Sequence, residues 1–287
     1  FLGHDPRRPA PLILGHEAAG VVALGPDAGR RVTINPLVSC GTCEFCRSDR
    51  ENLCQERQII SMPPREGSFA ERISMPLSNL VTVPDGVPLW QAALAEPMAC
   101  GWHAVRLSLK QAPEPAERIE AVVLGGGAIG LSAALSLSIQ GVSRITVLET
   151  NAARRDRMRR ALPQFDFQAS FEDTSGSLPH LVVDAVGIAP TRKIASTIVR
   201  PGGVIAHIGL GDNEGGLDVR RMTLQEISFI GTYTYSAKDF RDTAQAIFDG
   251  KFGSFDWVDQ RPLSEGAGAF DDLLAGRVDA GKIVLMT

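Results

Sequence analysis

Strands and helices alternate through the middle of this chain, and that alternation limits the fold more than any other feature of the sequence. Apolar strands that alternate with helices are typical of a parallel sheet whose two faces are both covered. We therefore predict an α/β fold built on a doubly wound parallel sheet. The predicted strands are residues 121–124, 145–148, 181–185 and 204–208, and the predicted helices between them are 129–140, 152–162 and 191–199.

A glycine-rich turn joins the first of these strands to the helix that follows it. Gly125, Gly127 and Gly130 match the pattern G-x-G-x-x-G. The first glycine permits the tight turn, the second lets a pyrophosphate approach the backbone, and the third lets helix and strand pack closely. The free N–H groups at the start of the helix then face the phosphates. A purely structural turn is the alternative, but the position between an apolar strand and a helix favours dinucleotide binding.

An acidic residue ends the next strand, where dinucleotide-binding folds recognise a ribose. Glu149 follows the glycine turn at about the expected spacing. Because a carboxylate there would repel a 2′-phosphate, the sequence favours NAD over NADP. Arg154 and Arg155 keep NADP open as the alternative, although we interpret them as part of a solvated helix face. Arg154 stays among the candidate cofactor-binding residues because it is so close to Glu149 in the sequence.

The first hundred residues are predicted to be rich in β-structure. Short β-branched or alternating runs at 20–24, 31–35 and 69–74 are set off by Gly, Pro and Asp. A helix is predicted over 92–107, with Pro97 near its start or at a kink. The simplest architecture is a β-rich domain into which the α/β domain is inserted. After residue 235 we expect helices at 238–248 and 267–274 and a closing strand at 282–285.

Four cysteines interrupt the β-rich region. Cys40, Cys43, Cys46 and Cys54 have the spacing C-x2-C-x2-C-x7-C. Thiolates so close together can surround one metal ion tetrahedrally, and structural zinc sites use ligands at such spacings. Disulfides are a weaker interpretation because two intervening residues leave little freedom for a relaxed bridge. Redox or iron–sulfur chemistry is the remaining alternative.

Two other segments contain residue types that commonly serve as metal ligands. The run Gly15-His16-Glu17 places a good ligand beside a carboxylate, although such a pair is more often structural. Glu96 precedes Pro97 in an apolar stretch, where burying a carboxylate is costly unless it binds a metal or a hydrogen-bond donor. The alternative for Glu96 is an acid favoured by the dipole at the start of a helix.

The composition narrows the classes of partner. The formal net charge is −4 and the pI is about 5.8. The chain therefore offers no basic surface for nucleic acid or for an anionic membrane. Its apolar runs are too short to span a bilayer, and no signal-like segment opens the sequence. We expect a cytoplasmic protein whose substrate is a small molecule.

Taken in order, the Gly15-His16-Glu17 run, the cysteines, Glu96 and the glycine turn resemble the zinc-containing medium-chain alcohol dehydrogenases, over nearly the whole chain. The resemblance implies a GroES-like catalytic domain over 1–99 and 235–287, with a structural zinc lobe at 39–55. It implies a Rossmann coenzyme domain over 100–234. It also implies one structural zinc on the cysteines and one catalytic zinc.

By the same resemblance, the catalytic zinc is held by His16, Glu17 and Glu96, with Glu17 as either a ligand or its immediate support. Glu96 stands where the liver-type enzymes have a cysteine, which is typical of the sorbitol, threonine and sugar-acid dehydrogenase branch. The zinc would act as a Lewis acid on the alcohol, and hydride would pass to the nicotinamide. The resemblance also implies a homodimer or homotetramer.

Further cofactor contacts follow from the resemblance. Gly125, Gly127, Ile129 and Gly130 would contact the dinucleotide at the glycine turn. Gly209 and Leu210 would line the nicotinamide end, with an ordinary strand-to-loop turn as the alternative for that segment.

One departure from the family is serious. The family's first ligand of the catalytic zinc is a cysteine upstream of the Gly-His-Glu run, followed by a Ser or Thr that relays the alcohol proton. This sequence contains neither, and the segments 16–32 and 162–181 are short for the family. We expect that an N-terminal segment and some internal residues are absent from this sequence. A chain of only 287 residues would hold its catalytic zinc poorly.

Three functions remain. The leading one is zinc- and NAD-dependent oxidation of a secondary alcohol of a polyol, sugar or sugar acid. The second is a threonine-type or simple secondary-alcohol dehydrogenase with the same apparatus. The third is a non-catalytic module whose cysteine lobe is an interaction surface, and the acidic pI and complete glycine pattern argue against it.

Overall fold

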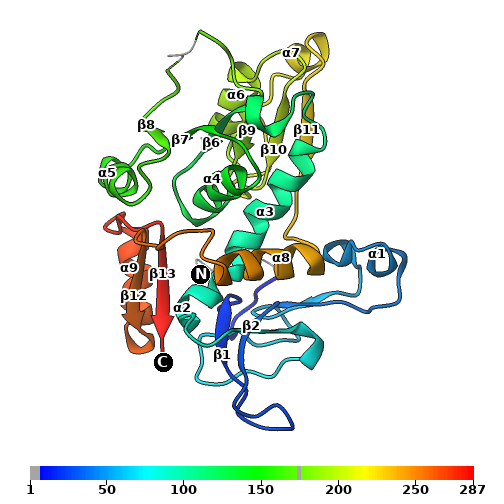
Figure 1. The fold of residues 1–287 in the computed structure, drawn as a ribbon, viewed down its shortest axis with the longest axis vertical. Coiled ribbons are helices and arrows are strands. Elements are labelled where there is room, and N and C mark those ends of the chain that lie inside the picture. Colours follow the sequence, from blue (N-terminus) through cyan, green and yellow to red (C-terminus); the bar gives the residue numbers. More distant parts are fainter. Residues whose placement is uncertain (1–6, 173–175) are drawn as a thin grey trace.

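A six-stranded parallel sheet forms one half of the molecule, shown at the top of Figure 1. The computed structural model describes residues 7–172 and 176–287. The chain starts in the middle of the sheet, builds one edge, and returns to build the other, which is the order of a Rossmann fold. From edge to edge the strands are β8 (Asp166–Gln168), β7 (Arg144–Leu148), β6 (Glu120–Leu124), β9 (Leu181–Asp184), β10 (Val204–His207) and β11 (Ser228–Gly231).

The central strands β6, β9 and β10 are buried on both faces of this sheet, which explains why they are mostly apolar. Along β6, Ala121 and Val123 belong to one hydrophobic core, whereas Val122 and Leu124 belong to the other. Successive side chains of a strand point to opposite faces, so each face needs its own cover of helices. The helices after the strands are α4 (Ala128–Ile139), α5 (Ala152–Ala161), α6 (Ala189–Ile198) and α7 (Val219–Leu224).

The other half is built from small sheets. An antiparallel sheet contains β1 (Ala18–Val21), β2 (Arg31–Ile34) and β5 (Leu80–Thr82), and β3 (Leu37–Val38) pairs with β4 (Gln58–Ile59). The cysteine loop carries α1 (Glu44–Arg47) and the 3-10 turn η1 (Glu51–Leu53). The C-terminal part pairs β12 (Val258–Pro262) with β13 (Lys282–Met286) around α9 (Gly266–Leu274), and the remaining 3-10 turns are Leu77–Asn79, Ala116–Arg118 and Leu263–Glu265.

One long helix connects the two halves. After the short helix α2 (Leu89–Ala93), α3 (Ala95–Leu109) runs up to the parallel sheet, and α8 (Ala237–Phe248) packs against it (Figure 1). Helix α3 approaches α4 very closely at Gly101, because a Cβ there would lie 2.1 Å from the hydroxyl oxygen of Ser132. Within the described residues, no helix is both long and apolar enough to cross a membrane.

The predicted α/β elements are confirmed to within two residues at each end, but predictions for the first hundred residues need correction. The strand expected at 20–24 lies instead at Ala18–Val21. The helix expected over 92–107 begins at Leu89 and is broken at Leu94 into α2 and α3. The strands β8, β11 and β12 were not predicted, since they are short or polar.

Residues 69–74 do not form the predicted strand. Gly67, Ser68 and Phe69 donate backbone hydrogen bonds to the carbonyls of residues 13–15, at 2.7 to 2.9 Å, and the chain then bends away. Glu71 and Arg72 are exposed, so the apparent alternation of this segment buries no continuous face. Without such a face, alternation gives no reason to form a strand.

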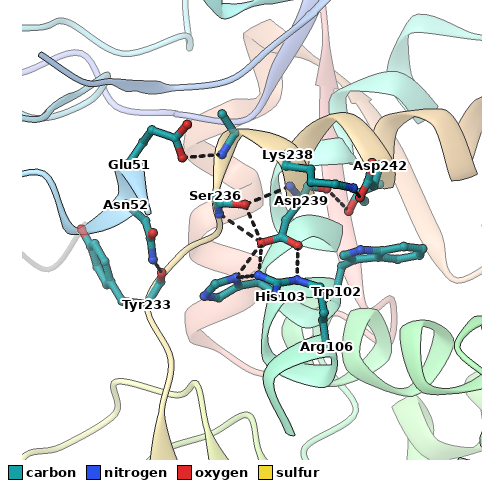
Figure 2. Close-up of polar contacts among 12 residues, drawn as sticks. Glu51, Asn52, Trp102, His103, Arg106, Tyr233, Ser236, Lys238, Asp239 and Asp242 are labelled. Atoms are coloured by element: carbon teal, nitrogen blue, oxygen red, sulfur yellow. Dashed lines mark hydrogen bonds and ion pairs between the residues drawn. The ribbon is translucent and has the colours of Figure 1, made fainter. Parts of the chain in front are cut away.

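A buried carboxylate joins α3 to α8. Asp239 is 1% exposed and accepts hydrogen bonds from Arg106 Nε at 2.6 Å and Arg106 Nη2 at 2.8 Å (Figure 2). His103 Nδ1 lies 2.7 Å from the same carboxylate, and the Ser236 hydroxyl donates to it at 2.8 Å. Burial raises the pKa of Asp239, but the hydrogen bonds from His103, Arg106 and Ser236 outweigh burial and hold that pKa well below its usual range.

Replacing Asp239 with asparagine is expected to lower the free energy of unfolding by about 2 kcal/mol at neutral pH, because Arg106 and His103 lose a charged partner. The folded-state pKa lies below the unfolded value of about 3.9. The stabilisation is therefore present above that value and fades below it by about 1.4 kcal/mol per pH unit. Urea unfolding at pH 7 and pH 3 should show the gap between wild type and Asp239→Asn narrowing at pH 3.

Asp242→Asn is the matched control on the same helix. Asp242 pairs with Lys238 on the solvent-exposed side, and such pairs contribute about 0.5 kcal/mol or less. A gap between wild type and Asp239→Asn that does not change with pH would contradict the assignment.

Candidate active site and metal sites

The four cysteines converge at the end of the loop that carries α1. Cys46 Sγ lies 3.8 Å from Cys40 Sγ and 3.5 Å from Cys43 Sγ, and all four sulfurs, including that of Cys54, lie within 4.8 Å of one another. Zinc–sulfur bonds of about 2.3 Å in a tetrahedron place the sulfurs about 3.8 Å apart. The cysteines are free thiols at these distances, so the cluster has the dimensions of a zinc shell and not those of a disulfide pair.

The electrostatics of the cluster also fit a cation. The backbone N–H groups of Thr42 and Cys43 donate to Cys40 Sγ at 3.5 and 3.4 Å and lower the pKa of Cys40 to about 6. Burial, together with contact to Cys43, raises the pKa of Cys46 to about 11. Without a metal, thiols with such different pKa values would not all be deprotonated at neutral pH. A zinc ion, in contrast, holds all its cysteine ligands as thiolates.

Substituting Cys40 with serine is expected to remove about one zinc ion per chain and to lower the melting temperature, because a structural zinc site loses most of its affinity with one ligand gone. Elemental analysis and thermal unfolding would measure both effects. Cys100→Ser is the matched control, since Cys100 lies outside the cluster and its loss should leave the zinc content of the lobe unchanged. Equal zinc content in Cys40→Ser and wild type would contradict a zinc site at these cysteines.

A second group of possible metal ligands contains His16, Glu17 and Glu96, which were predicted from separate segments. One ligand atom from each of the three residues lies within 4.8 Å of the other two. His16 and Glu17 directly precede β1, after Gly15 in a left-handed conformation (φ +94°). A Cβ at Gly15 would lie 2.7 Å from the ring of Phe69, so the turn that presents His16 requires glycine for two reasons.

Glu96 lies in the first turn of α3 and is 6% exposed. The hydroxyl of Tyr235 donates to Glu96 Oε1 at 2.8 Å. Burial is the main cause that raises the pKa of Glu96, and the charge of Glu17 raises it further, against the opposing effects of His16, Tyr235 and Lys282. Lys282 of β13 pairs with Glu17. The carboxylates of Glu17 and Glu96 thus have a single lysine, Lys282, close to them. A divalent cation between them would compensate the negative charge that the lysine leaves unbalanced.

The glycine turn has the geometry that a dinucleotide requires. Gly125 has φ +100°, and a Cβ at Gly130 would lie 1.7 Å from the carbonyl oxygen of Gly125. A Cβ at Gly127 would meet no atom within 4 Å, so space remains beside the backbone there. Helix α4 begins at Ala128, followed by Ile129, and its N-cap makes no side-chain hydrogen bond. Its first N–H groups are therefore suited to hold phosphate oxygens.

Glu149 lies directly after β7 against this turn. Its carboxylate accepts hydrogen bonds from the backbone N–H of Gly126 at 3.1 Å and of Asn151 at 2.7 Å. The prediction that Arg154 and Arg155 form a solvated face was wrong. Arg154 Nη1 donates to Glu149 Oε2 at 3.3 Å, and Arg155 Nη1 donates to the Glu149 carbonyl at 2.8 Å. The carboxylate of Glu149 thus pairs with one guanidinium group and its backbone carbonyl with the other, at the start of α5.

Gly209 and Leu210 follow β10 at the carboxyl edge of the sheet. A Cβ at Gly209 would lie 2.2 Å from the carbonyl carbon of Val186, so the two loops pass backbone against backbone. Leu210 is 75% exposed. The carboxylate of Asp184, at the end of β9, accepts hydrogen bonds from the backbone N–H groups of Val186 and Gly187. This edge, where strand order reverses between β6 and β9, is where doubly wound sheets bind ligands.

The hydrogen-bond partners of the candidate metal ligands could not be predicted from the sequence. Tyr235 and Lys282 contact Glu96 and Glu17 from 139 and 265 positions away along the chain. Neither residue belongs to a local pattern, so only the tertiary structure identifies them. His103 and Cys100 lie outside the metal-ligand groups found among the described residues, and His103 bonds Asp239.

The chain matches two family models in the order that the architecture suggests. Residues 1–85 match the alcohol dehydrogenase GroES-like domain, and residues 128–249 match the zinc-binding dehydrogenase model. Together with the Rossmann sheet, these matches define a two-part zinc-binding oxidoreductase.

Curated relatives make the assignment more specific. The chain is 32% identical to L-galactonate-5-dehydrogenase of Escherichia coli K12 over 263 residues, which cover 87% of this chain and 75% of that protein. It is 27% identical to the probable D-xylulose reductase A of Aspergillus clavatus, over 93% of this chain and 78% of that one. A solved NAD-dependent alcohol dehydrogenase superimposes with a TM-score of 0.83 at 26% identity, covering 99% of this chain and 85% of that one. The chain belongs to the zinc-containing medium-chain alcohol dehydrogenase family, in its polyol and sugar-acid branch.

Proposed function

We propose that this protein oxidises a secondary hydroxyl of a polyol, sugar or sugar acid with NAD as the hydride acceptor, and reduces the matching ketone in reverse. The observation that carries the proposal is the convergence of His16, Glu17 and Glu96, within 4.8 Å of one another. The relatives named above act on L-galactonate and D-xylulose, which are polyhydroxylated, and this supports the substrate class. A threonine-type or simple secondary-alcohol dehydrogenase is the alternative.

In this proposal His16 and Glu96 hold the catalytic zinc, with Glu17 either a third ligand or the support of that site. Lys282 holds the Glu17 carboxylate, and Tyr235 holds that of Glu96. A bound zinc lowers the pKa of a coordinated alcohol and so favours its deprotonation near neutral pH. The cysteines Cys40, Cys43, Cys46 and Cys54 hold a second zinc that stabilises the lobe over residues 39–55.

The coenzyme is proposed to lie across the carboxyl edge of the parallel sheet. Gly125, Gly127, Ile129 and Gly130 would hold the pyrophosphate, and Gly209 with Leu210 would lie at the nicotinamide end. The Glu149 carboxylate would accept hydrogen bonds from the ribose hydroxyls. Arg154, which already pairs with Glu149, would hold that carboxylate in position. We accordingly propose a coenzyme domain over 100–234 and a catalytic domain over 1–99 and 235–287.

The substrate class is tested by a panel that contains polyols, aldonic acids, threonine and simple secondary alcohols, read by NADH absorbance. Turnover of polyols or aldonic acids at a kcat/KM at least tenfold above the others supports the proposal. A preference for threonine or for simple alcohols would favour the alternative.

His16→Ala is expected to lower kcat/KM by about 1,000-fold or more, since zinc contributes several kcal/mol to the stabilisation of the developing charge. NADH affinity, measured by fluorescence, should not change. His180→Ala serves as the control, because His180 lies at the amino end of the sheet, where it contacts Glu120. Substantial activity in His16→Ala would refute this mechanism.

Glu149→Gln is expected to raise the KM for NAD about tenfold or more, because a hydrogen bond to a charged acceptor contributes about 1.5–3 kcal/mol. The preference for NAD over NADP should shrink at the same time, since the repulsion of a 2′-phosphate disappears. Steady-state kinetics with both coenzymes measure these changes. Asp156→Asn, at an exposed acid of α5, should leave both KM values unchanged.

The oligomeric state is proposed to be a homodimer, or a homotetramer made of such dimers, formed through the edge strand β11. Its residues Ser228, Phe229 and Gly231 are exposed, and an edge strand offers unpaired backbone groups to another strand. We also propose a cytoplasmic location, which the free thiols of the zinc lobe support.

A further inference from the structure

A short segment after β11 passes between the cysteine lobe and helix α3. The side-chain amide of Asn52 in the lobe donates to the carbonyl of Tyr233 at 2.8 Å, and Glu51 accepts from the N–H of Ala237 at 3.2 Å (Figure 2). Asn52 is 4% exposed and lies between Cys46 and Cys54 in the sequence. The lobe therefore holds this segment, residues 233–237, at both of its ends.

The middle of the segment bonds a candidate zinc ligand. Tyr235 is 1% exposed, and its hydroxyl donates to Glu96 Oε1 at 2.8 Å. Its ring packs beside Phe240, with centroids 5.7 Å apart. A hydrogen bond to one carboxylate oxygen fixes the rotation of the whole group, so it determines where the second oxygen lies.

A second contact sets the segment against the same helix. Ser236, next to Tyr235, bonds Asp239, and Asp239 bonds His103 and Arg106 of α3. His103 lies about two turns along α3 from Glu96. The helix and the segment are therefore joined at two points, and Tyr235 has little freedom to move relative to the helix that carries Glu96.

We propose that Tyr235 is a positioning residue for the metal ligand Glu96, and that the cysteine lobe keeps Tyr235 in place through Asn52. The inference rests on the proposed function, since it takes Glu96 to be a ligand of the catalytic zinc. The structural zinc lobe then contributes to metal affinity at the catalytic site, in addition to its own folding.

Tyr235→Phe removes only the hydroxyl and keeps the buried ring. Zinc affinity at the catalytic site should fall about 10- to 100-fold, the usual effect of losing a partner that orients a ligand. Tyr233→Phe is the matched control, because it removes the same group two positions away and spares the backbone carbonyl that Asn52 binds. The full-length protein is dialysed against buffered free Zn²⁺, and bound zinc is counted at each concentration. NADH affinity should match wild type.

Asn52→Leu tests the link to the lobe, and it also serves if Tyr235→Phe does not fold. It should weaken zinc binding at the catalytic site about threefold or more, while the zinc at the four cysteines remains bound. In the Tyr235→Phe background the same substitution should have an effect below about twofold, because its route to Glu96 is gone.

The outcomes separate the inference from the proposed function. If wild type binds zinc only at the cysteines, the catalytic assignment fails. If wild type binds two zinc ions and Tyr235→Phe matches Tyr233→Phe, the inference fails and the proposed function stands. If Asn52→Leu changes zinc affinity equally with and without the Tyr235 hydroxyl, the role of the lobe is refuted.

Discussion

The burial of the Glu96 carboxylate beside Glu17 is the constraint on which the rest of the site depends. A buried carboxylate needs hydrogen-bond donors or positive charge close to it. Here both arrive from distant parts of the chain, as the Tyr235 hydroxyl and the Lys282 ammonium group. The C-terminal strand and the segment after β11 must therefore return to the first turn of α3, and the two-part architecture is the means by which they do so.

Helix α3 gives this arrangement its rigidity. It carries Glu96 at its start and the partners of Asp239 further along, so one element connects the candidate metal site with the α8 contact. The low pKa of Asp239 follows from that connection, because its carboxylate accepts hydrogen bonds from two elements at once. The same residue closes the capping box of α8 with Ser236, which ties helix initiation to the domain contact.

The sequence predicted those features whose physical cause is local. The glycine turn and the cysteine cluster are each recognisable from a few neighbouring residues. The buried central strands of the Rossmann half are recognisable because they are mostly apolar. Residues 69–74 misled the prediction because alternation alone does not imply a buried face. Arg154 and Arg155 were misjudged because each forms a hydrogen bond to Glu149 across a turn, one to its carboxylate and one to its backbone carbonyl. The bonds to Tyr235 and Lys282 link positions too far apart in the chain for any single-sequence pattern to show them.

Gly101 has a meaning that extends beyond packing. It lies on the helix whose first turn carries the candidate zinc ligand Glu96, and it touches the helix that begins at the glycine turn, with no room for even a methyl group between them. The contact fixes how closely α3, which carries Glu96 in its first turn, can lie to α4, which starts at the glycine turn. Hydride transfer is sensitive to donor–acceptor separation, so in the proposed enzyme a residue that touches neither reactant would help to set the distance over which the hydride travels.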